Sequence, residues 1–141
     1  MAEDIATRVA TNAIEAFNSA DWAGFRRLLA PTLVYEETGT GRRVSGPDAY
    51  VELCQGWKQA LPDARGDIRR SVASGDTVVQ EITWTGTHDG PLETPTGTVP
   101  ASGAKIEVDA TFWATVDGEQ LKEARHHLDV LSLLRQIGAM G

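Results

Sequence analysis

Residues 105–130, KIEVDATFWATVDGEQLKEARHHLDV, decide the fold because they combine two alternating runs with a turn signal between them. Apolar and polar residues alternate along both halves, which is typical of strands that bury one face. The Asp117-Gly118 dipeptide favours a tight hairpin turn. Every second residue from 106 to 116 is apolar. The segment therefore predicts a β-hairpin whose first strand faces the core with this apolar row.

The hairpin also predicts which side chains of its second strand are buried. Residues paired across a hairpin point to the same face of the sheet. A two-residue turn places Arg125, His127 and Asp129 opposite the apolar row and leaves His126 on the other face. A bulge would shift this register. We expect three ionisable side chains to point inward.

Buried charge has two explanations, because a desolvated carboxylate is costly unless it is paired or neutral. In the first, Arg125, His127 and Asp129 satisfy one another as a structural polar cluster. In the second, the sheet forms a cup with Asp129 at its bottom as an acid or base. The residues alone leave both open.

The rest of the chain supplies helices first and strands afterwards. A four-residue apolar repeat predicts an amphipathic helix over residues 3–18, and a short second helix follows Asp21 and stops at Pro31. A third helix ends at Pro62. Turn residues separate the expected strands, which cover residues 32–37, 67–74, 77–88, 105–116 and 119–130. We predict one α+β domain over residues 1–141, with three N-terminal helices packed on one face of a curved antiparallel sheet.

Composition excludes several classes of partner. The 13 basic residues are scattered and outnumbered by 20 acidic ones, giving a formal charge of -7. Phosphate-backbone binding needs clustered Lys and Arg, so we expect no nucleic-acid partner. The single cysteine, Cys54, cannot form an internal disulfide, and no Cys/His spacing predicts a metal site.

The same residues bear on location. Glu3 and Asp4 stand where a signal peptide would be basic, and no apolar run is long enough to span a bilayer. We expect a cytoplasmic protein that does not interact with membranes.

Four segments together resemble the SnoaL-like polyketide cyclases of the NTF2-like superfamily. They are AFNSADWAGFRRLLAPTLVYEE (16–37), GPDAYVELCQGWKQALPD (46–63), GDTVVQEITWTGTHDGPLETPTGTVPASGAKIEV (75–108) and LDVLSLLRQIG (128–138). The most specific pieces are G-T-H-x-G, the P-x-G loop before a strand, and an Asp followed by an apolar turn that ends in Q-I-G. The resemblance implies a cone-shaped α+β barrel.

It also implies a cofactor-free enzyme that closes a polyketide ring by intramolecular aldol condensation. The acid/base residue of such enzymes matches Asp129. A carbon between two carbonyls is acidic enough for a carboxylate in an apolar pocket, and the enolate spreads over the substrate's conjugated rings. Neither a metal nor a cofactor is required.

Further site residues are expected around Asp129. Strand alternation points His88 into the cup, where it would hydrogen-bond a substrate oxygen or simply be a satisfied histidine at a strand end. His127 and Arg125 would orient Asp129 or bind substrate. Four aromatic residues are candidates for stacking on a flat substrate, although residues of this kind more often simply fill the core: Trp57, Trp84, Tyr35 and Phe112. In contrast, Glu36 and Glu37, with Arg42 and Arg43, are interpreted as a solvated strand end and loop.

Two other functions remain open, because this fold hosts several chemistries. An inward Arg125–Asp129 pair would suit an epoxide hydrolase or another NTF2-like lyase or isomerase, with Glu123 or Glu81 as a second carboxyl. A non-catalytic module would bind a small apolar ligand and neutralise Asp129 in an ion pair. Resemblance to the family, with an outward Trp113, further predicts a homodimer or higher homo-oligomer.

Overall fold

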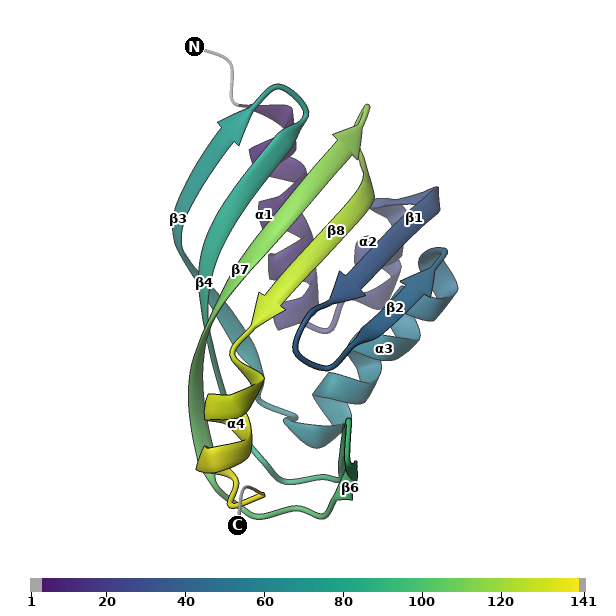
Figure 1. The fold of residues 1–141 in the computed structure, drawn as a ribbon. Helices are drawn as coiled ribbons and strands as arrows, with labels where there is room; N and C mark the ends of the chain where they lie inside the picture. The colour runs from purple at the N-terminus through teal and green to yellow at the C-terminus, as the bar shows by residue number, and fades with distance from the viewer. Residues whose placement is uncertain (1–3, 140–141) are drawn as a thin grey trace.

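The computed structural model describes residues 4–139, in which helices cover one face of a curved sheet (Figure 1). The elements follow in the order α1 (Ile5–Asn18), α2 (Trp22–Arg27), β1 (Leu29–Glu37), β2 (Arg42–Ser45), α3 (Pro47–Ala60), β3 (Arg65–Ser74), β4 (Thr77–Thr87), β5 (Leu92–Thr94), β6 (Gly97–Val99), β7 (Lys105–Asp117), β8 (Gln120–Leu128) and α4 (Val130–Gln136). The predicted α+β class with three N-terminal helices is confirmed.

Six strands form the main sheet in the order β2-β1-β8-β7-β4-β3. Neighbouring strands are antiparallel except β1 and β8, which run parallel, so the sheet is mixed and not antiparallel throughout. The segment between β4 and β7 contains the short β5–β6 hairpin. The apolar turn after Asp129 is the helix α4, which lies beside β7 at one end of the sheet (Figure 1).

The core lies between the three N-terminal helices and the concave face of the sheet. Alternate residues of β7 are buried as predicted, from Ile106 to Val116. On α1, the face that contains Val9, Ala13 and Phe17 is buried against β3, β4 and β7. Within residues 4–139, none of the helices has the length and apolar character needed to cross a membrane.

The predicted register of the β7–β8 hairpin is wrong. The turn encloses Gly118 and Glu119 and pairs Asp117 with Gln120, and a bulge then shifts the ladder so that Phe112 lies opposite His126. One extra residue on a strand reverses the faces of everything beyond it. The bulge thus turns small or neutral side chains of β8 inward, which avoids the cost of burying charges.

The orientation of four residues changes as a result. Arg125, His127 and Asp129 are exposed, contrary to the prediction that they face the core. His126, predicted to point outward, is buried together with Ala124 on the concave face. The histidine of this strand that faces the helices is therefore His126 and not His127.

Candidate functional site

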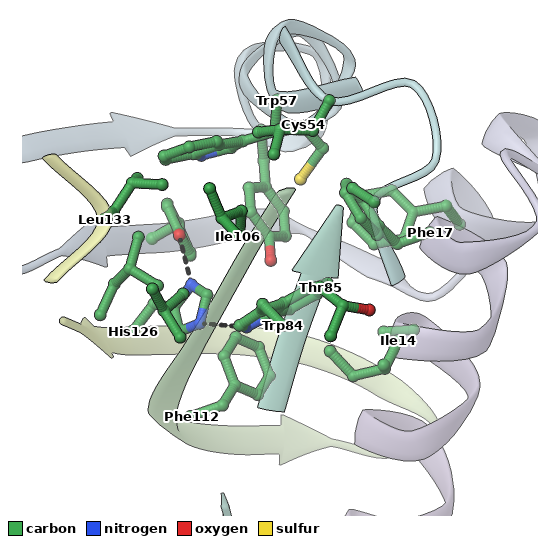
Figure 2. A pocket seen from close by; sticks show the side chains of 18 residues that line it. Ile14, Phe17, Cys54, Trp57, Trp84, Thr85, Ile106, Phe112, His126 and Leu133 are labelled. Atoms are coloured by element: carbon green, nitrogen blue, oxygen red, sulfur yellow. Dashed lines mark hydrogen bonds between the residues drawn. The ribbon is translucent and has the colours of Figure 1, made fainter. Parts of the chain in front are cut away.

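An apolar chamber with a volume of about 70 Å³ lies between the helices and the concave face of the sheet (Figure 2). Helices α1, α2, α3 and α4 and strands β1, β4, β7 and β8 each contribute side chains to its wall. The lining residues are Ala13, Ile14, Phe17, Phe25, Tyr35, Tyr50, Cys54, Trp57, Leu61, Ala64, Trp84, Thr85, Ile106, Val108, Phe112, His126, Leu128 and Leu133. His126 is the single histidine among them, and within residues 4–139 no carboxylate or cation belongs to the wall.

Aromatic rings surround the imidazole of His126. The rings of Phe112 and Trp84 meet it edge to face, with centroids 5.5 and 5.8 Å away. The indole Nε1 of Trp84 donates to His126 Nε2 at 3.1 Å (Figure 2). The Tyr35 hydroxyl lies 3.1 Å from His126 Nδ1. Both ring nitrogens therefore have a partner although the side chain is buried.

These contacts fix the protonation of the ring. An indole N–H can only donate, so Nε2 accepts and carries no proton. Burial lowers the pKa of His126 to about 4, against the opposing charge of Glu37, so the ring is neutral at pH 7 and its proton sits on Nδ1. Nδ1–H then donates to the Tyr35 oxygen, and the Tyr35 O–H donates to Glu37 Oε2 at 2.8 Å. A directed chain of hydrogen bonds runs from Trp84 through His126 and Tyr35 to Glu37.

Glu37 ends this chain as a buried carboxylate with 1% of its surface exposed. Trp57 Nε1 donates to its Oε2 at 2.9 Å, and Thr40 donates to its Oε1 at 2.8 Å. Arg42 reaches Oε1 through its Nη2 at 2.6 Å and its Nε at 3.0 Å. Burial alone would raise the pKa of Glu37, but the Arg42 guanidinium and these hydrogen bonds hold it below its ordinary value. Glu37 is therefore ionised, and its interpretation as a solvated residue is wrong.

The four aromatic candidates all lie on the chamber wall. Tyr35 comes from β1, Trp57 from α3, Trp84 from β4 and Phe112 from β7. Their side chains converge on the chamber from opposite layers of the fold. Stacking on a substrate stays a prediction for each of them.

Asp129 lies outside the chamber, between Leu128 of β8 and the first turn of α4. Its Oδ1 accepts from the Ser132 N–H at 3.0 Å, so the carboxylate is the N-cap of α4. A second, more polar groove, the outer groove, is lined by Thr38, Arg69, Glu81, Ile82, Thr83, Asp109, Ala110, Thr111, His127, Leu128 and Asp129. In this groove, His127 Nδ1 lies 3.2 Å from Thr38 Oγ1. Among the ion pairs of residues 4–139, none joins Arg125 to Asp129. The three residues are not gathered into a site on the concave face.

His88 is buried, but it does not line the chamber. Its Nδ1 accepts from the Ser102 N–H at 3.2 Å and lies 2.8 Å from Ser102 Oγ. Its Nε2 has no hydrogen-bond partner in the described part of the chain. A role for His88 toward substrate stays a prediction.

Sequence reasoning missed His126 and Glu37. Glu37 has a signal in the sequence, because it continues the inward alternation of Leu33 and Tyr35. His126 has no such signal, because only the bulge in the β7–β8 pairing turns it to the inner face. Across residues 4–139, no group of three or more His, Cys, Asp or Glu side chains is arranged to hold a metal ion.

The chain matches one family model over nearly its whole length. Residues 7–137 match the model described as SnoaL-like polyketide cyclase. A comparison of the sequence with curated proteins finds no match.

Solved structures share the fold at low sequence identity. IdmH, a proposed polyketide cyclase from Streptomyces antibioticus, superposes with a TM-score of 0.81 at 24% identity, covering 94% of this chain and 98% of that one. AclR, a proposed hydroxylase from Streptomyces galilaeus, has a TM-score of 0.81 at 22% identity, covering 96% and 82%. TsrD from Streptomyces laurentii has a TM-score of 0.83 at 20% identity and covers 99% of both chains. A ketosteroid isomerase-like fold from Catenulispora acidiphila also matches, with a TM-score of 0.77 at 17% identity, covering 92% of both chains.

Proposed function

The chain belongs to the SnoaL-like polyketide cyclase family, and we propose on this basis that it is a cofactor-independent enzyme that closes a ring in a polyketide-type substrate by intramolecular aldol reaction. The chamber supports this proposal because its wall is apolar and contains several aromatic side chains, which suits an uncharged conjugated substrate. We infer that the substrate binds in the chamber and that the carbon from which the base removes a proton lies near His126.

One observation carries the chemical part of the proposal. His126 is a neutral base in an apolar chamber, and it is connected through Tyr35 to the ionised carboxylate of Glu37. A buried base of this kind is typical of sites that transfer protons. The proton on Nδ1 leaves Nε2 as the nitrogen that can accept a proton from substrate.

Ring closure needs two proton transfers at this nitrogen. The substrate displaces the Trp84 indole, and Nε2 takes the proton from a carbon that lies between two carbonyls. The electron pair of the broken C–H bond passes into the enolate, whose carbon then bonds to a second carbonyl carbon of the same molecule. The oxygen of that carbonyl becomes an alkoxide and takes the proton back from Nε2. The base is restored, and no oxidant or cofactor is consumed.

The hydrogen-bond chain favours this cycle at its charged stage. When Nε2 gains a proton, the imidazolium donates through Nδ1 to Tyr35, whose hydroxyl donates to Glu37. The negative charge of Glu37 raises the pKa of His126 against the effect of burial. Tyr35 and Glu37 are in place before the reaction begins. The site can therefore stabilise the imidazolium form of His126 without rearranging.

Asp129 is the second candidate for the acid/base role, because the resemblance assigns it that role. Its carboxylate is exposed, caps α4 and lines the outer groove and not the chamber. Catalysis by Asp129 therefore requires its segment to move, whereas His126 already faces the chamber. We propose His126 as the acid/base and treat Asp129 as the alternative that mutation must test.

The other functions fit the geometry less well. The epoxide hydrolase, or related lyase or isomerase, needed Arg125 and Asp129 inside with a second buried carboxyl, but Arg125, Asp129, Glu81 and Glu123 are all exposed. The inward orientation that this mechanism assumed is therefore absent for these four residues. The hypothesis of a binding module requires the charge of Asp129 to be neutralised in an ion pair. None of the ion pairs in residues 4–139 includes Asp129.

Hydrogen exchange tests the proposal without the natural substrate. A neutral aromatic β-diketone that cannot cyclise is incubated with the protein in D2O, and deuterium at the central carbon is followed by proton NMR. The proposal predicts exchange above the buffer rate that saturates with ligand concentration. Binding without accelerated exchange would contradict an enzyme that forms enolates and would favour the binding module.

A further inference from the structure

Two Glu–Arg ion pairs of the same composition lie side by side on β1 and β2. Glu36 pairs with Arg43 at 2.7 Å, and Glu37 pairs with Arg42 at 2.6 Å. Strand alternation sends them to opposite faces of the sheet. The Glu36–Arg43 side chains are 36% and 63% exposed, whereas the Glu37 side chain is fully buried and that of Arg42 is 34% exposed. The second pair contacts residues that line the chamber, because Glu37 accepts from Tyr35 and Trp57.

Arg42 donates two hydrogen bonds to the same oxygen of Glu37. Its Nε and Nη2 both donate to Oε1, which leaves Oε2 for Tyr35 and Trp57. The guanidinium also lies 5.3 Å from the centroid of the Trp57 ring, whose Nε1 donates to Oε2. Arg42 therefore contacts both the anion and one of its other donors.

Glu37 has few other ionisable neighbours. Tyr35 adjoins it on β1, and Tyr50 and Cys54 face it from α3, but burial raises the pKa of all three and leaves them uncharged at neutral pH. His126 lies opposite it on β8, next to His127. Arg42 is thus the cation paired with this carboxylate among residues 4–139.

We propose that Arg42 is a positioning residue, which keeps Glu37 ionised and aimed at Tyr35 so that the carboxylate's negative charge acts on His126. Arg42 is not itself among the residues that line the chamber, although it contacts Trp57, which is. It acts through Glu37 and Tyr35 on the group that contacts substrate. Only the consequence for turnover rests on the proposed function, because the effect on Glu37 and His126 is a property of the folded protein.

The test follows Glu37 and His126 directly by NMR. The side-chain 13Cδ shift of Glu37 and the ring 15N shifts of His126 are recorded against pH in the wild type, Arg42→Gln, Arg42→Lys and Arg43→Gln. Arg43→Gln is the matched control, since it removes the same charge from the next residue of the same strand. Circular dichroism at each pH confirms that the variants are folded.

The sign of the expected change follows from the two charges. Without Arg42, the rise in the Glu37 pKa that burial causes is no longer offset. The titration midpoint of Glu37 therefore moves to higher pH. Glu37 is then neutral where His126 titrates, and loss of the anion moves the His126 midpoint to lower pH. Arg42→Lys keeps the charge but not the two-point contact, so its Glu37 midpoint falls between those of the wild type and Arg42→Gln. Arg43→Gln matches the wild type.

Equal Glu37 midpoints in Arg42→Gln and Arg43→Gln would overturn the inference. If Arg42→Gln does not fold, Arg42→Lys decides, and a midpoint equal to that of the wild type would overturn the inference. Turnover separates this outcome from the fate of the proposed function. Shifted midpoints in a protein that never catalyses exchange would contradict only the proposed function, whereas exchange with unshifted midpoints would contradict only the role of Arg42.

Discussion

Glu37 lies directly beside His126 across the parallel β1–β8 ladder, and the hydroxyl of Tyr35 bridges their side chains. This relationship brings the two groups that the site most depends on together from opposite halves of the sequence. It exists only because the bulge turns His126 toward the concave face. A phenol and a neutral imidazole thereby lie on one wall of an apolar chamber, and the phenol connects the imidazole to an anion that is not part of the wall.

The buried histidine should make the protein sensitive to acid. Burial lowers the pKa of His126 to about 4, whereas the unfolded chain has the ordinary value of about 6.5. Between these values the unfolded state binds more protons, so stability is lost as the pH falls. We expect His126 to account for about 2 kcal/mol of the free energy of unfolding lost between pH 7 and pH 5. Urea titrations at the two pH values measure the loss.

Glu37 acts in the same direction, because its pKa is lowered and its contribution is lost as the pH falls through the folded value. The His126→Gln variant should therefore keep some acid sensitivity but show a smaller loss between pH 7 and pH 5. His127→Gln, at an exposed neighbouring position, should follow the wild type. Equal pH dependence in the wild type and His126→Gln would refute the assignment.

Glu37 and Glu36 should differ in their contribution to stability. The Glu37→Gln change removes the charge from a buried carboxylate with five hydrogen-bonding donor groups and leaves Arg42 without its partner. We expect a loss of about 2 kcal/mol, since bonds to charged groups are the stronger kind and Arg42 regains some hydration. Glu36→Gln, in an exposed pair, should cost under about 1 kcal/mol. Similar losses in the two variants would mean that the buried pair has no special role.

A larger side chain on α4 should close the chamber. Leu133 lines the chamber, whereas Leu131 on the same helix is 48% exposed. We expect Leu133→Trp to weaken the binding of 1-tetralone, a neutral aromatic ketone, about tenfold or more, while Leu131→Trp binds it like the wild type. Isothermal titration calorimetry gives the dissociation constants. Unchanged binding in folded Leu133→Trp would mean that the ligand occupies another place.

The outer face of the sheet should support self-association. Trp113 on β7 is 45% exposed and Val72 on β3 is 59% exposed. We expect sedimentation to detect a dimer, and Trp113→Lys to shift it toward monomer because a charge replaces apolar surface at the proposed contact. A wild type that sediments only as a monomer at high protein concentration would contradict the prediction.

The strand and helix faces were predictable because they depend on local periodicity. The buried row of β7 and the apolar face of α1 both follow from spacing alone. The register of β8 was not predictable in this way. A turn signal fixes the residues beside the turn, but the bulge between Thr115 and Val116 and their partners reverses the faces further along.

The site was predictable only in part for the same reason. The aromatic residues Tyr35, Trp57, Trp84 and Phe112 line the chamber because each belongs to an inward face. The buried state of Glu37 depends on Arg42 from β2, a short strand that the sequence analysis treated as loop. Pairing between residues of different strands leaves no signal in the local sequence. For this reason Glu37 is interpreted as solvated from the sequence, although it is buried and ends the hydrogen-bond chain.

The most direct test of the central claim compares two variants in the D2O exchange assay, one on each side of the sheet. His126→Gln removes the proposed base inside the chamber, and Asp129→Asn removes the carboxylate that caps α4 outside it. Both must retain the fold and bind the diketone for the comparison to be valid. We predict that His126→Gln lowers the exchange rate about a hundredfold or more, while Asp129→Asn stays within about threefold of the wild type. Full exchange in His126→Gln together with its loss in Asp129→Asn would contradict the account and return the acid/base role to Asp129.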